Sequence, residues 1–295
     1  MISISNLFSP KSKAPESLEQ RVAKVCQLLS EADHVLIGAG AGLSAAAGLV
    51  YSGADFEKEF APWIERYGIT DLYTSSFYPF ATEEERWAYW ARHIWFARFR
   101  PAGMPLYMQL LELVKQKDYF VLTTNVDAQF QKSGFDVGRI FATQGDYAYL
   151  QPASGQPARL YYAEKLVMQM LAATKDCRIP AELVPHVPET GEPMAPNLRS
   201  DDTFVEDAHW HEQAAKYQHF VEAASEGKLL LLEFGVGFNT PGIIRFPFEH
   251  MAARFLHTHL IRFNRDHPQL AVPQVKNYVC FQETLDVNLL KRFKI

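Results

Sequence analysis

The residues that could do chemistry lie in three short segments, and the first of these is rich in glycine. Residues 38–48 are Gly-Ala-Gly-Ala-Gly-Leu-Ser-Ala-Ala-Ala-Gly, directly after the apolar run 34–37. Backbone N–H groups at the start of a helix bind phosphate, and glycine lets a phosphate approach the backbone closely. The segment therefore predicts a nucleotide-binding turn between a strand and a helix. The alternative is a tight turn that opens a buried, Ala-rich helix.

The other two segments place polar side chains directly after apolar runs. Residues 123–127 are Thr-Thr-Asn-Val-Asp, so Asn125 and Asp127 point to the same side of an extended chain. Polar residues at the carboxyl end of a parallel strand face the ligand crevice, although an Asx turn or a helix N-cap would explain the same residues. Residues 143–146 are Thr-Gln-Gly-Asp, and Gln144 alone does not indicate catalysis.

Strands that alternate with helices must position these segments. A helix begins after Ser17, whose capping-box partner is Gln20. Hydrophobic periodicity predicts helices at 106–116, 208–226 and 247–254, and strands at 34–37, 119–123, 140–143, 228–234 and 258–263. This alternation predicts an α/β fold with a Rossmann-like, doubly wound parallel sheet.

Two inserts interrupt the alternation, and we expect them to form a smaller domain. The first insert is rich in aromatic residues at helical spacing, whereas the second carries seven prolines and is expected to be rich in loops. The predicted division is a nucleotide-binding domain of residues 17–50, 106–150 and 206–295, a small domain of residues 51–105 and 151–205, and an N-terminal arm of residues 1–16.

The composition limits the class of protein. Of the 295 residues, 48% are apolar and 21% charged, as in globular proteins, and the net charge of −5 argues against a nucleic-acid partner. The three cysteines, Cys26, Cys177 and Cys280, form no CxxC pair, which fits a reducing compartment. No apolar run approaches the roughly 18 residues of a membrane span, and the N-terminal segment has no signal-peptide core. We therefore expect a cytoplasmic protein without a membrane partner.

Taken together, the segments resemble the sirtuins, a family of NAD-dependent protein-modifying enzymes. Residues 40–44, Gly-Ala-Gly-Leu-Ser, are similar to the sirtuin GAGxS loop, and residues 123–127 are similar to the TQNxD segment. Residues 143–145 stand where sirtuins have an HG dipeptide, residues 235–238 where they have GTSLxV, and Asn264 where an asparagine follows the late strand. The order and spacing of these motifs make the resemblance specific.

Departures from the sirtuin pattern point to one branch of that family. Gln144 replaces the catalytic histidine, the stretch from Tyr51 to Phe56 replaces a Pro-Asp-Phe-Arg segment, and both CxxC pairs of the zinc ribbon are missing. The chain resembles the macrodomain-linked class M sirtuins of microbes, which share the glutamine and a Tyr-x-Gly-x-x-Phe stretch. This resemblance implies a protein ADP-ribosyltransferase that modifies a lipoylated glycine-cleavage H-like carrier protein. It also implies functional association with a macrodomain protein and a lipoate ligase.

The resemblance assigns a role to each matching residue. Asn125 would orient the nicotinamide ribose, Asp127 would fix the nicotinamide pocket, and Gln144 would hydrogen-bond the ribose hydroxyls, so these are the expected catalytic residues. The expected residues for binding NAD, the substrate, are Gly40, Ala41, Gly42, Ser44, Tyr51, Phe56, Gly235, Gly237 and Asn264. Neither zinc nor another metal is expected.

The glutamine that stands in place of the catalytic histidine changes which reaction is expected. Sirtuin deacylation needs a base that deprotonates a ribose hydroxyl, and a glutamine amide neither accepts nor releases a proton at neutral pH. Displacement of nicotinamide depends mainly on positioning and electrostatics, so this step should survive. The sequence therefore favours ADP-ribose transfer to a protein. The alternatives are an NAD hydrolase, a weak NAD-dependent deacylase and a non-enzymatic NAD-sensing module.

Overall fold

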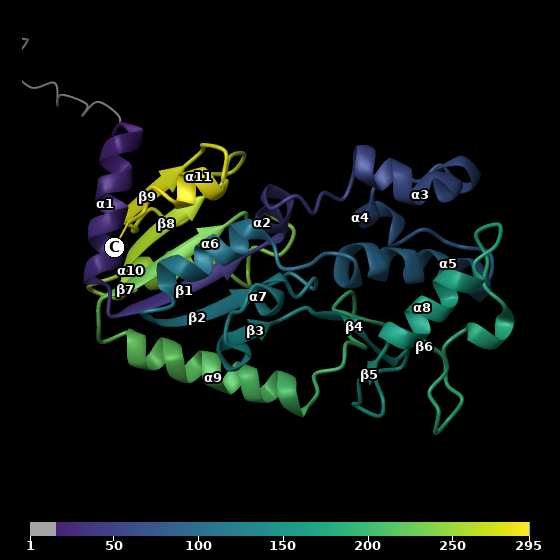
Figure 1. The fold of residues 1–295 in the computed structure, drawn as a ribbon. Coiled ribbons are helices and arrows are strands. Elements are labelled where there is room, and N and C mark those ends of the chain that lie inside the picture. Colours follow the sequence, from purple (N-terminus) through teal and green to yellow (C-terminus); the bar gives the residue numbers. More distant parts are fainter. Residues whose placement is uncertain (1–15, 295) are drawn as a thin grey trace, which may run out of the picture.

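A six-stranded parallel sheet is the centre of the computed structural model, which describes residues 16–294 (Figure 1). Its strands lie in the order β3-β2-β1-β7-β8-β9, and every neighbouring pair is parallel. The strands are β1 (His34–Ala39), β2 (Asp118–Thr123), β3 (Ile140–Ala142), β7 (Leu229–Phe234), β8 (His259–Phe263) and β9 (Tyr278–Phe281). The chain builds outward from β1 on one side and from β7 on the other, which confirms the predicted doubly wound α/β sheet.

Helices cover both faces of this sheet, as strands with continuous apolar runs require. Val35 and Ile37 of β1 pack in one core with side chains of α1 and α6, whereas Leu36 packs in another with side chains of α9 and α10. The helices are α1 (Leu18–Glu31), α2 (Ala41–Ala46), α6 (Pro105–Val114), α7 (Gln129–Lys132), α9 (Ala208–Ala224), α10 (Arg245–Arg254) and α11 (Val287–Leu290). The sequence pattern predicts neither β9 nor α11.

Capping residues set the helix starts that the sequence predicts. At α1, Gln20 N donates to Ser17 Oγ at 3.2 Å, and Ser17 N donates to Gln20 Oε1 at 2.8 Å. The predicted capping box is therefore confirmed. Asp207 caps α9 in a similar way, because its carboxylate accepts from Trp210 N at 2.8 Å.

The two inserts pack against each other beside the sheet, on the right of Figure 1. The first contributes α3 (Ala54–Tyr67), α4 (Leu72–Ser75) and α5 (Glu83–Ile94), which continues as a π-helical turn over Trp95–Phe99. The second contributes a three-stranded antiparallel sheet of β4 (Gly145–Pro152), β5 (Tyr161–Tyr162) and β6 (Met194–Leu198), together with α8 (Glu164–Ala173). Both inserts share an apolar core in which Phe60, Trp87 and Met170 are buried.

The second insert has more regular structure than its proline content predicts. Helix α8 buries Val167 and Met170 at helical spacing, but the surrounding prolines outweigh this short signal in the sequence. The boundary predicted between residues 150 and 151 falls inside β4, so the small sheet begins within the segment assigned to the large domain. The predicted arm lies outside the described residues, except for Glu16. No helix within residues 16–294 is long and apolar enough to span a membrane.

Two backbone segments meet very closely where the strand order reverses. Gly42 N, in the first turn of α2, donates to Gly235 O, directly after β7, at 3.0 Å. A Cβ on Gly42 would lie 2.7 Å from both Gly235 Cα and Gly235 O. Gly235 also has a φ of +57°, a conformation that costs glycine nothing sterically. Backbone packing therefore requires glycine at both positions.

Gly42→Ala should destabilise the fold. The added methyl group would overlap backbone atoms, so we expect the free energy of unfolding to fall by roughly 1–3 kcal/mol, the usual cost of overpacking. Gly242→Ala is the matched control, because a Cβ there meets no atom within 4 Å. Denaturant unfolding followed by circular dichroism measures both variants. Equal stability of the two variants would contradict the predicted clash.

Candidate active site

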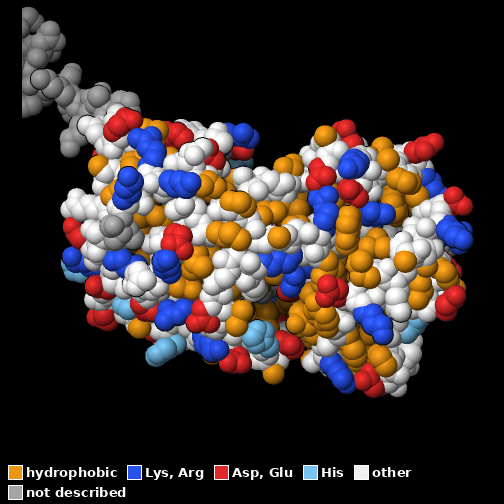
Figure 2. All heavy atoms as spheres, viewed as in Figure 1, with side chains coloured by type: hydrophobic (Ala, Val, Ile, Leu, Met, Phe, Trp, Pro, Cys, Tyr) orange, Lys and Arg blue, Asp and Glu red, His pale blue; other side chains and the backbone are white. Residues whose placement is uncertain are grey.

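A cleft of about 490 Å³ opens at the carboxyl ends of β1, β2 and β7, where the parallel sheet meets the small domain. Its walls include the glycine-rich turn after β1, residues 124–126 after β2, Gln144 before β4 and the loop 235–240 after β7. Doubly wound sheets bind ligands at this edge, where the strand order reverses. Figure 2 shows a waist between the sheet body and the small domain, with charged side chains of both signs around it.

Two glycine-containing segments, one after β1 and one after β7, contribute to the cleft wall nearest the sheet. The predicted residues Gly40, Ala41, Gly42, Gly235 and Gly237 all line the cleft. A Cβ on Gly40 would lie 2.9 Å from Gly235 O, so the two turns leave no room for a side chain between them. Their bare backbone can approach a phosphate closely. These residues therefore fit the pyrophosphate of a dinucleotide.

A network of polar side chains lies directly beneath this wall. Ser44 Oγ donates to Asp127 Oδ2 at 2.5 Å and accepts from the Tyr107 hydroxyl at 2.7 Å. Burial raises the pKa of Tyr107 well above its usual value, so this hydroxyl stays protonated and can donate. Asn125 Nδ2 donates to Gly40 O and to Ser44 Oγ, both at 3.1 Å. The network therefore joins the turn after β1, the end of β2 and α6 into one unit.

Asn125 is the member of this network whose side chain lines the cleft together with the glycine turn. Its amide nitrogen has acceptors in Gly40 and Ser44 and a third, more distant one in the Tyr107 hydroxyl at 3.4 Å. These contacts fix the orientation of the amide. Its carbonyl oxygen takes part in none of the hydrogen bonds found among residues 16–294, so it is available to a ligand hydroxyl or to developing positive charge.

Ser44 and Asp127 are buried, each 2% exposed, and neither is among the residues that line the cleft. Asp127 Oδ2 accepts from Ser44, and Asp127 Oδ1 accepts from Gln129 N at 3.0 Å. Burial raises the pKa of the Asp127 carboxyl above its usual value, against the effect of these hydrogen bonds. These hydrogen bonds allow both side chains to position Asn125, and the roles expected of them toward NAD stay predictions.

Two further expected binding residues also lie outside the cleft lining. Phe56 stacks on Phe60 in the core of the small domain, with 5.0 Å between ring centroids. Asn264 Nδ2 donates to Val236 O at 2.9 Å, so its amide holds one loop against another. Packing holds the Phe56 ring and a backbone carbonyl holds the Asn264 amide, and the roles expected of both residues in binding NAD stay predictions. Tyr51, from the same stretch as Phe56, does line the cleft.

Gln144 faces the cleft from the turn between β3 and β4. Its backbone carbonyl accepts from Arg199 N at 3.1 Å, while its side-chain amide makes no hydrogen bond within the described residues. Gly145 follows with a φ of +97°, and a Cβ there would overlap Asn197 O. The turn that presents Gln144 thus depends on this glycine. Arg199 lines the cleft beside Gln144 and packs its guanidinium over Phe204, 4.4 Å from the ring centroid.

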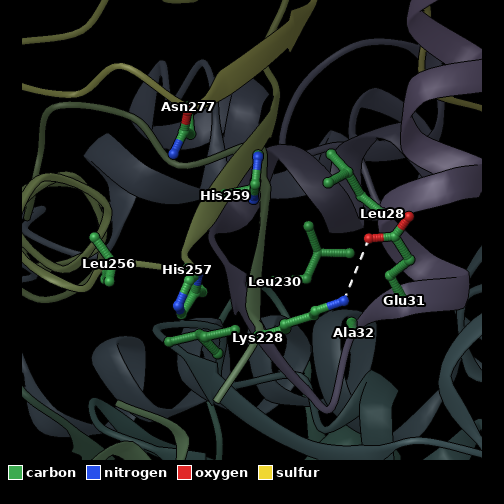
Figure 3. A pocket seen from close by; sticks show the side chains of 10 residues that line it. Leu28, Glu31, Ala32, Lys228, Leu230, Leu256, His257, His259 and Asn277 are labelled. Atoms are coloured by element: carbon green, nitrogen blue, oxygen red, sulfur yellow. Dashed lines mark hydrogen bonds and ion pairs between the residues drawn. The ribbon is translucent and has the colours of Figure 1, made fainter. Parts of the chain in front are cut away.

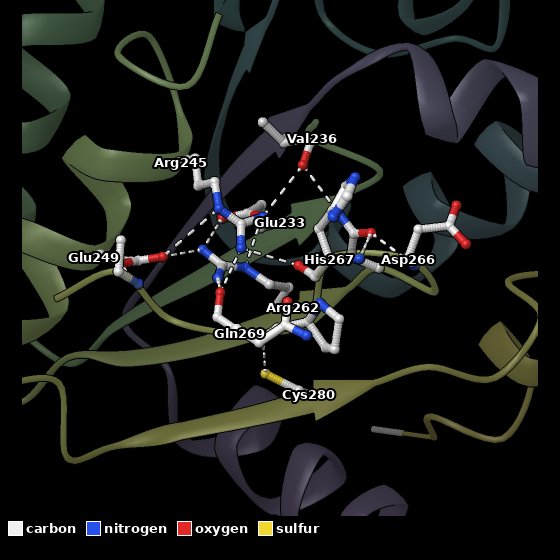
Figure 4. Close-up of polar contacts among 12 residues, drawn as sticks. Glu233, Val236, Arg245, Glu249, Arg262, Asp266, His267, Gln269 and Cys280 are labelled. Atoms are coloured by element: carbon white, nitrogen blue, oxygen red, sulfur yellow. Dashed lines mark hydrogen bonds and ion pairs between the residues drawn. The ribbon is translucent and has the colours of Figure 1, made fainter. Parts of the chain in front are cut away.

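A buried network of ion pairs supports the loop after β7 (Figure 4). Arg262 on β8 donates to both carboxylate oxygens of Glu233 on β7, at 2.7 and 2.8 Å, and to Glu249 on α10 at 2.7 Å. Arg245 lies 3.8 Å from Glu233, and all four side chains are fully buried. The Arg245 guanidinium also lies 4.4 Å from the ring centroid of Phe238, which lines the cleft. The network therefore supports the cleft wall from the sheet.

No motif predicts four other residues of the site. Tyr107 completes the hydrogen-bond network, and His93, Tyr147 and Arg199 line the cleft. Tyr107 and His93 lie in helices whose apolar residues recur at helical spacing, a pattern that predicts burial but no role in a site. The one available signal is that His93 places a polar ring at a buried position of α5, among Tyr89, Trp90 and Ile94.

A second pocket, of about 320 Å³, lies at the opposite edge of the sheet (Figure 3). It is lined at the amino ends of β7 and β8 by Lys228, His257 and His259, with Lys228 Nζ 3.5 Å from Glu31 Oε2. Among residues 16–294, no group of three or more His, Cys, Asp or Glu side chains could hold a metal ion. Because Asn125 and Gln144 lie at the carboxyl edge, we place the chemistry in the first cleft.

Comparison with known proteins gives two relatives in sequence, although no family model matches the chain. A protein ADP-ribosyltransferase of Staphylococcus aureus strain Mu50 is 34% identical over 253 residues, which cover 85% of this chain and 78% of that protein. A probable bifunctional ADP-ribose hydrolase/ADP-ribosyltransferase of Fusarium oxysporum f. sp. cubense is 32% identical over 262 residues. That match covers 84% of this chain but 42% of the longer Fusarium protein.

Solved structures agree on the fold. Sir2Tm bound to a propionylated peptide superposes with a TM-score of 0.58 at 13% identity, covering 92% of this chain and 96% of that one. A complex of Sir2 with a p53 peptide and NAD⁺ gives a TM-score of 0.55 at 15% identity, covering 91% and 95%. Identities this low establish the sirtuin fold alone, whereas the Staphylococcus relative establishes the activity class. The chain therefore belongs to the sirtuin-like protein ADP-ribosyltransferases.

Proposed function

We propose that this enzyme takes ADP-ribose from NAD, releases nicotinamide and joins the ADP-ribose to a lipoylated glycine-cleavage H-like carrier protein. Gln144 carries the proposal, because its unpartnered amide lines the cleft where the sirtuin motif has a catalytic histidine. The turns around Gly42 and Gly235 fit the pyrophosphate of NAD. The resemblance to class M sirtuins supports the choice of carrier.

The proposed reaction is a displacement at the anomeric carbon of the ribose. The bond from this carbon to the nicotinamide nitrogen breaks, and its electron pair leaves with nicotinamide. A nucleophile of the carrier protein bonds to the same carbon and loses its proton to solvent. Asn125, anchored through its amide nitrogen, would orient the ribose with its free carbonyl oxygen. Gln144 would hold the ribose hydroxyls without taking a proton, which is sufficient for a reaction that depends on positioning.

The name of the Fusarium relative supports a link to the removal of ADP-ribose. That protein is called a probable bifunctional ADP-ribose hydrolase/ADP-ribosyltransferase, and this chain matches 42% of it. We propose that a separate macrodomain protein removes the ADP-ribose that this enzyme attaches, and that a lipoate ligase prepares the acceptor. The reaction would then be reversible in the cell through a partner enzyme.

The direct test is incubation of the enzyme with labelled NAD and the lipoylated carrier. Label on the carrier supports the proposed transfer. Free labelled ADP-ribose without modified protein would instead indicate an NAD hydrolase. Intact NAD that binds to the protein would indicate a sensing module, and either of these two results would contradict the proposal.

Asn125→Ala should reduce transfer by about 10²–10³-fold, the usual effect of removing one positioned polar group from an active site. Stability should also fall modestly, because each lost buried hydrogen bond contributes about 0.5–1.5 kcal/mol. Tyr107→Phe is the control, since it removes a hydroxyl from the same network at a residue outside the cleft lining. Transfer rates and unfolding curves of both variants separate the two effects. Equal losses of transfer would mean that Asn125 acts only through packing.

Gln144→His should confer some NAD-dependent deacylation of acyl-lysine peptides. Histidine restores a side chain whose pKa lies near working pH, and general acid–base assistance contributes about 10²–10⁴-fold. Release of the free acyl product from a labelled peptide measures the gain. Robust deacylation by the unmodified enzyme would show that another residue already supplies the base.

Gln144→Ala is the matched variant for this position. It removes the amide without adding a base, so transfer should weaken and deacylation should not appear. Full transferase activity in this variant would mean that Gln144 does not contact the ribose.

We also propose that the second insert holds no zinc. A structural zinc site needs four ligands at suitable spacing, and residues 151–205 offer one cysteine, Cys177, and one histidine, His186. Elemental analysis of the purified protein should therefore find far less than one zinc per chain. A stoichiometric zinc content would overturn this expectation.

A further inference from the structure

The turn that carries Gln144 leads directly into an acidic residue that the proposed reaction does not use. Asp146 lies in the first turn-proximal part of β4, and its side chain is 22% exposed. Arg98, from the π-helical turn of the first insert, donates to both carboxylate oxygens of Asp146, at 2.7 and 3.2 Å. Such a bidentate pair fixes orientation as well as charge, because the planar guanidinium matches the carboxylate. The Gln144 turn is therefore tied to the first insert.

Asp146 also holds the backbone at the start of β4. Its Oδ1 accepts from Ala148 N at 2.7 Å, and Asp146 N donates to Asn197 Oδ1 at 3.2 Å. The pairing of β4 with β6 changes register between Gly145 and Leu150, so these contacts lie where the ladder is irregular. Irregularities of this kind re-aim the side chains beside them. The Asp146 carboxylate thus stabilises the backbone directly next to the residue that faces the cleft.

The other partner of the ion pair is held by the segment that follows β2. Lys132, on α7, donates from Nζ to the backbone carbonyl of Arg98. Gln129, on the same helix, donates from Nε2 to Ala102 O at 3.2 Å. Helix α7 begins shortly beyond Asn125, which lies just after the end of β2. The ion pair therefore connects the two segments that carry Asn125 and Gln144, although it includes neither residue.

We propose that Arg98 and Asp146 are positioning residues, whose ion pair sets the place of the Gln144 amide relative to Asn125. The inference rests on the proposed function, in which these two amides hold the ribose. Neither Arg98 nor Asp146 is among the residues that line the cleft, so both act through the backbone that they hold.

The side chain of Gln144 needs this support from its backbone. Its amide makes no hydrogen bond within the described residues, whereas its carbonyl accepts from Arg199 N at 3.1 Å. The backbone on both sides of Gln144 must therefore place the amide. A displacement of about 1 Å can lower a rate by about 10²-fold, so a shift of this turn should be visible in turnover.

Asp146→Asn is the first test, because it removes the charge and one acceptor but keeps an oxygen for Ala148 N. The kcat for release of nicotinamide from NAD should fall roughly tenfold to hundredfold. The KM for NAD should stay nearly unchanged, because Asp146 lies outside the glycine turns that fit the pyrophosphate. An unchanged kcat, or a raised KM at unchanged kcat, would overturn the proposal.

Glu283→Gln is the matched control for loss of an ion pair. Glu283 forms a similarly half-buried, bidentate pair with Arg21, at 3.0 and 2.5 Å, and neither residue lines the cleft. The control should lose stability in unfolding curves as Asp146→Asn does and keep its kcat. An equal fall of kcat in both variants would mean that the Asp146 effect reflects stability alone.

A double-mutant cycle with Gln144→Ala separates positioning from every independent effect. If Asp146 acts through Gln144, adding Asp146→Asn to Gln144→Ala should lower kcat little further. Additive losses, in which the double variant shows the product of the two single factors, would overturn the proposal. If Asp146→Asn fails to fold, the cycle is run with Arg98→Lys, which keeps the charge but not the bidentate geometry.

Nicotinamide release is the readout because it does not depend on an acceptor protein. Release without label on the carrier would refute the proposed transfer, while the cycle would still test the positioning role. If NAD binds and stays intact, the proposed function fails, and the same cycle is measured as NAD affinity by calorimetry. Non-additive losses of affinity would then support the positioning role, and additive losses would refute it.

Discussion

The cleft depends on the close backbone contact between Gly42 and Gly235. The two turns that follow β1 and β7 touch through main-chain atoms, with Gly42 N bonded to Gly235 O at 3.0 Å. This contact brings together the two halves of the doubly wound sheet and leaves no room for a side chain between Gly42 and Gly235. Asn125 then donates to Gly40 O, at the cap of α2, and to Ser44 Oγ, within α2. One steric constraint therefore sets both the backbone wall of the cleft and the position of the polar residue beside it.

Beneath this contact, a network of buried ion pairs in the sheet holds the loop that forms one wall of the cleft. Arg262 joins Glu233 and Glu249 across β7, β8 and α10, and Arg245 extends the group toward Phe238 in the cleft wall. Removing one member would leave its partners as unpaired buried charges, which typically costs about 3–5 kcal/mol. Apolar residues could fill the same volume, but they would not hold a loop through directional contacts. The network gives the loop after β7 a fixed geometry that a purely apolar core would not specify.

Local signals in the sequence predict the sheet and the glycine turns, because these depend on runs of neighbouring residues. Apolar runs identify the strands, and the glycines identify the close approach. Burial and partners are decided by tertiary contacts, so the sequence cannot distinguish Asn125, which lines the cleft, from Asp127, which lies behind it. For the same reason Phe56 is assigned to a ligand by its motif, although it packs in a core. His93 can be identified as a residue of the cleft only from the structure, because the position of α5 beside the cleft is a tertiary contact.

The protonation states around the cleft restrict the chemistry that this chain can perform. His93 is held neutral by burial, with a pKa of about 3, and the phenols of Tyr51 and Tyr147 are held protonated. Asp127 accepts one hydrogen bond at each carboxylate oxygen, from Ser44 and from Gln129, and does not line the cleft. Gln144, at the place of the sirtuin base, cannot exchange a proton at all. These groups are suited to binding and orienting a ligand rather than to taking a proton from it. The proposed transfer fits such a site, because displacement at the anomeric carbon depends mainly on positioning, whereas the later steps of deacylation need a base.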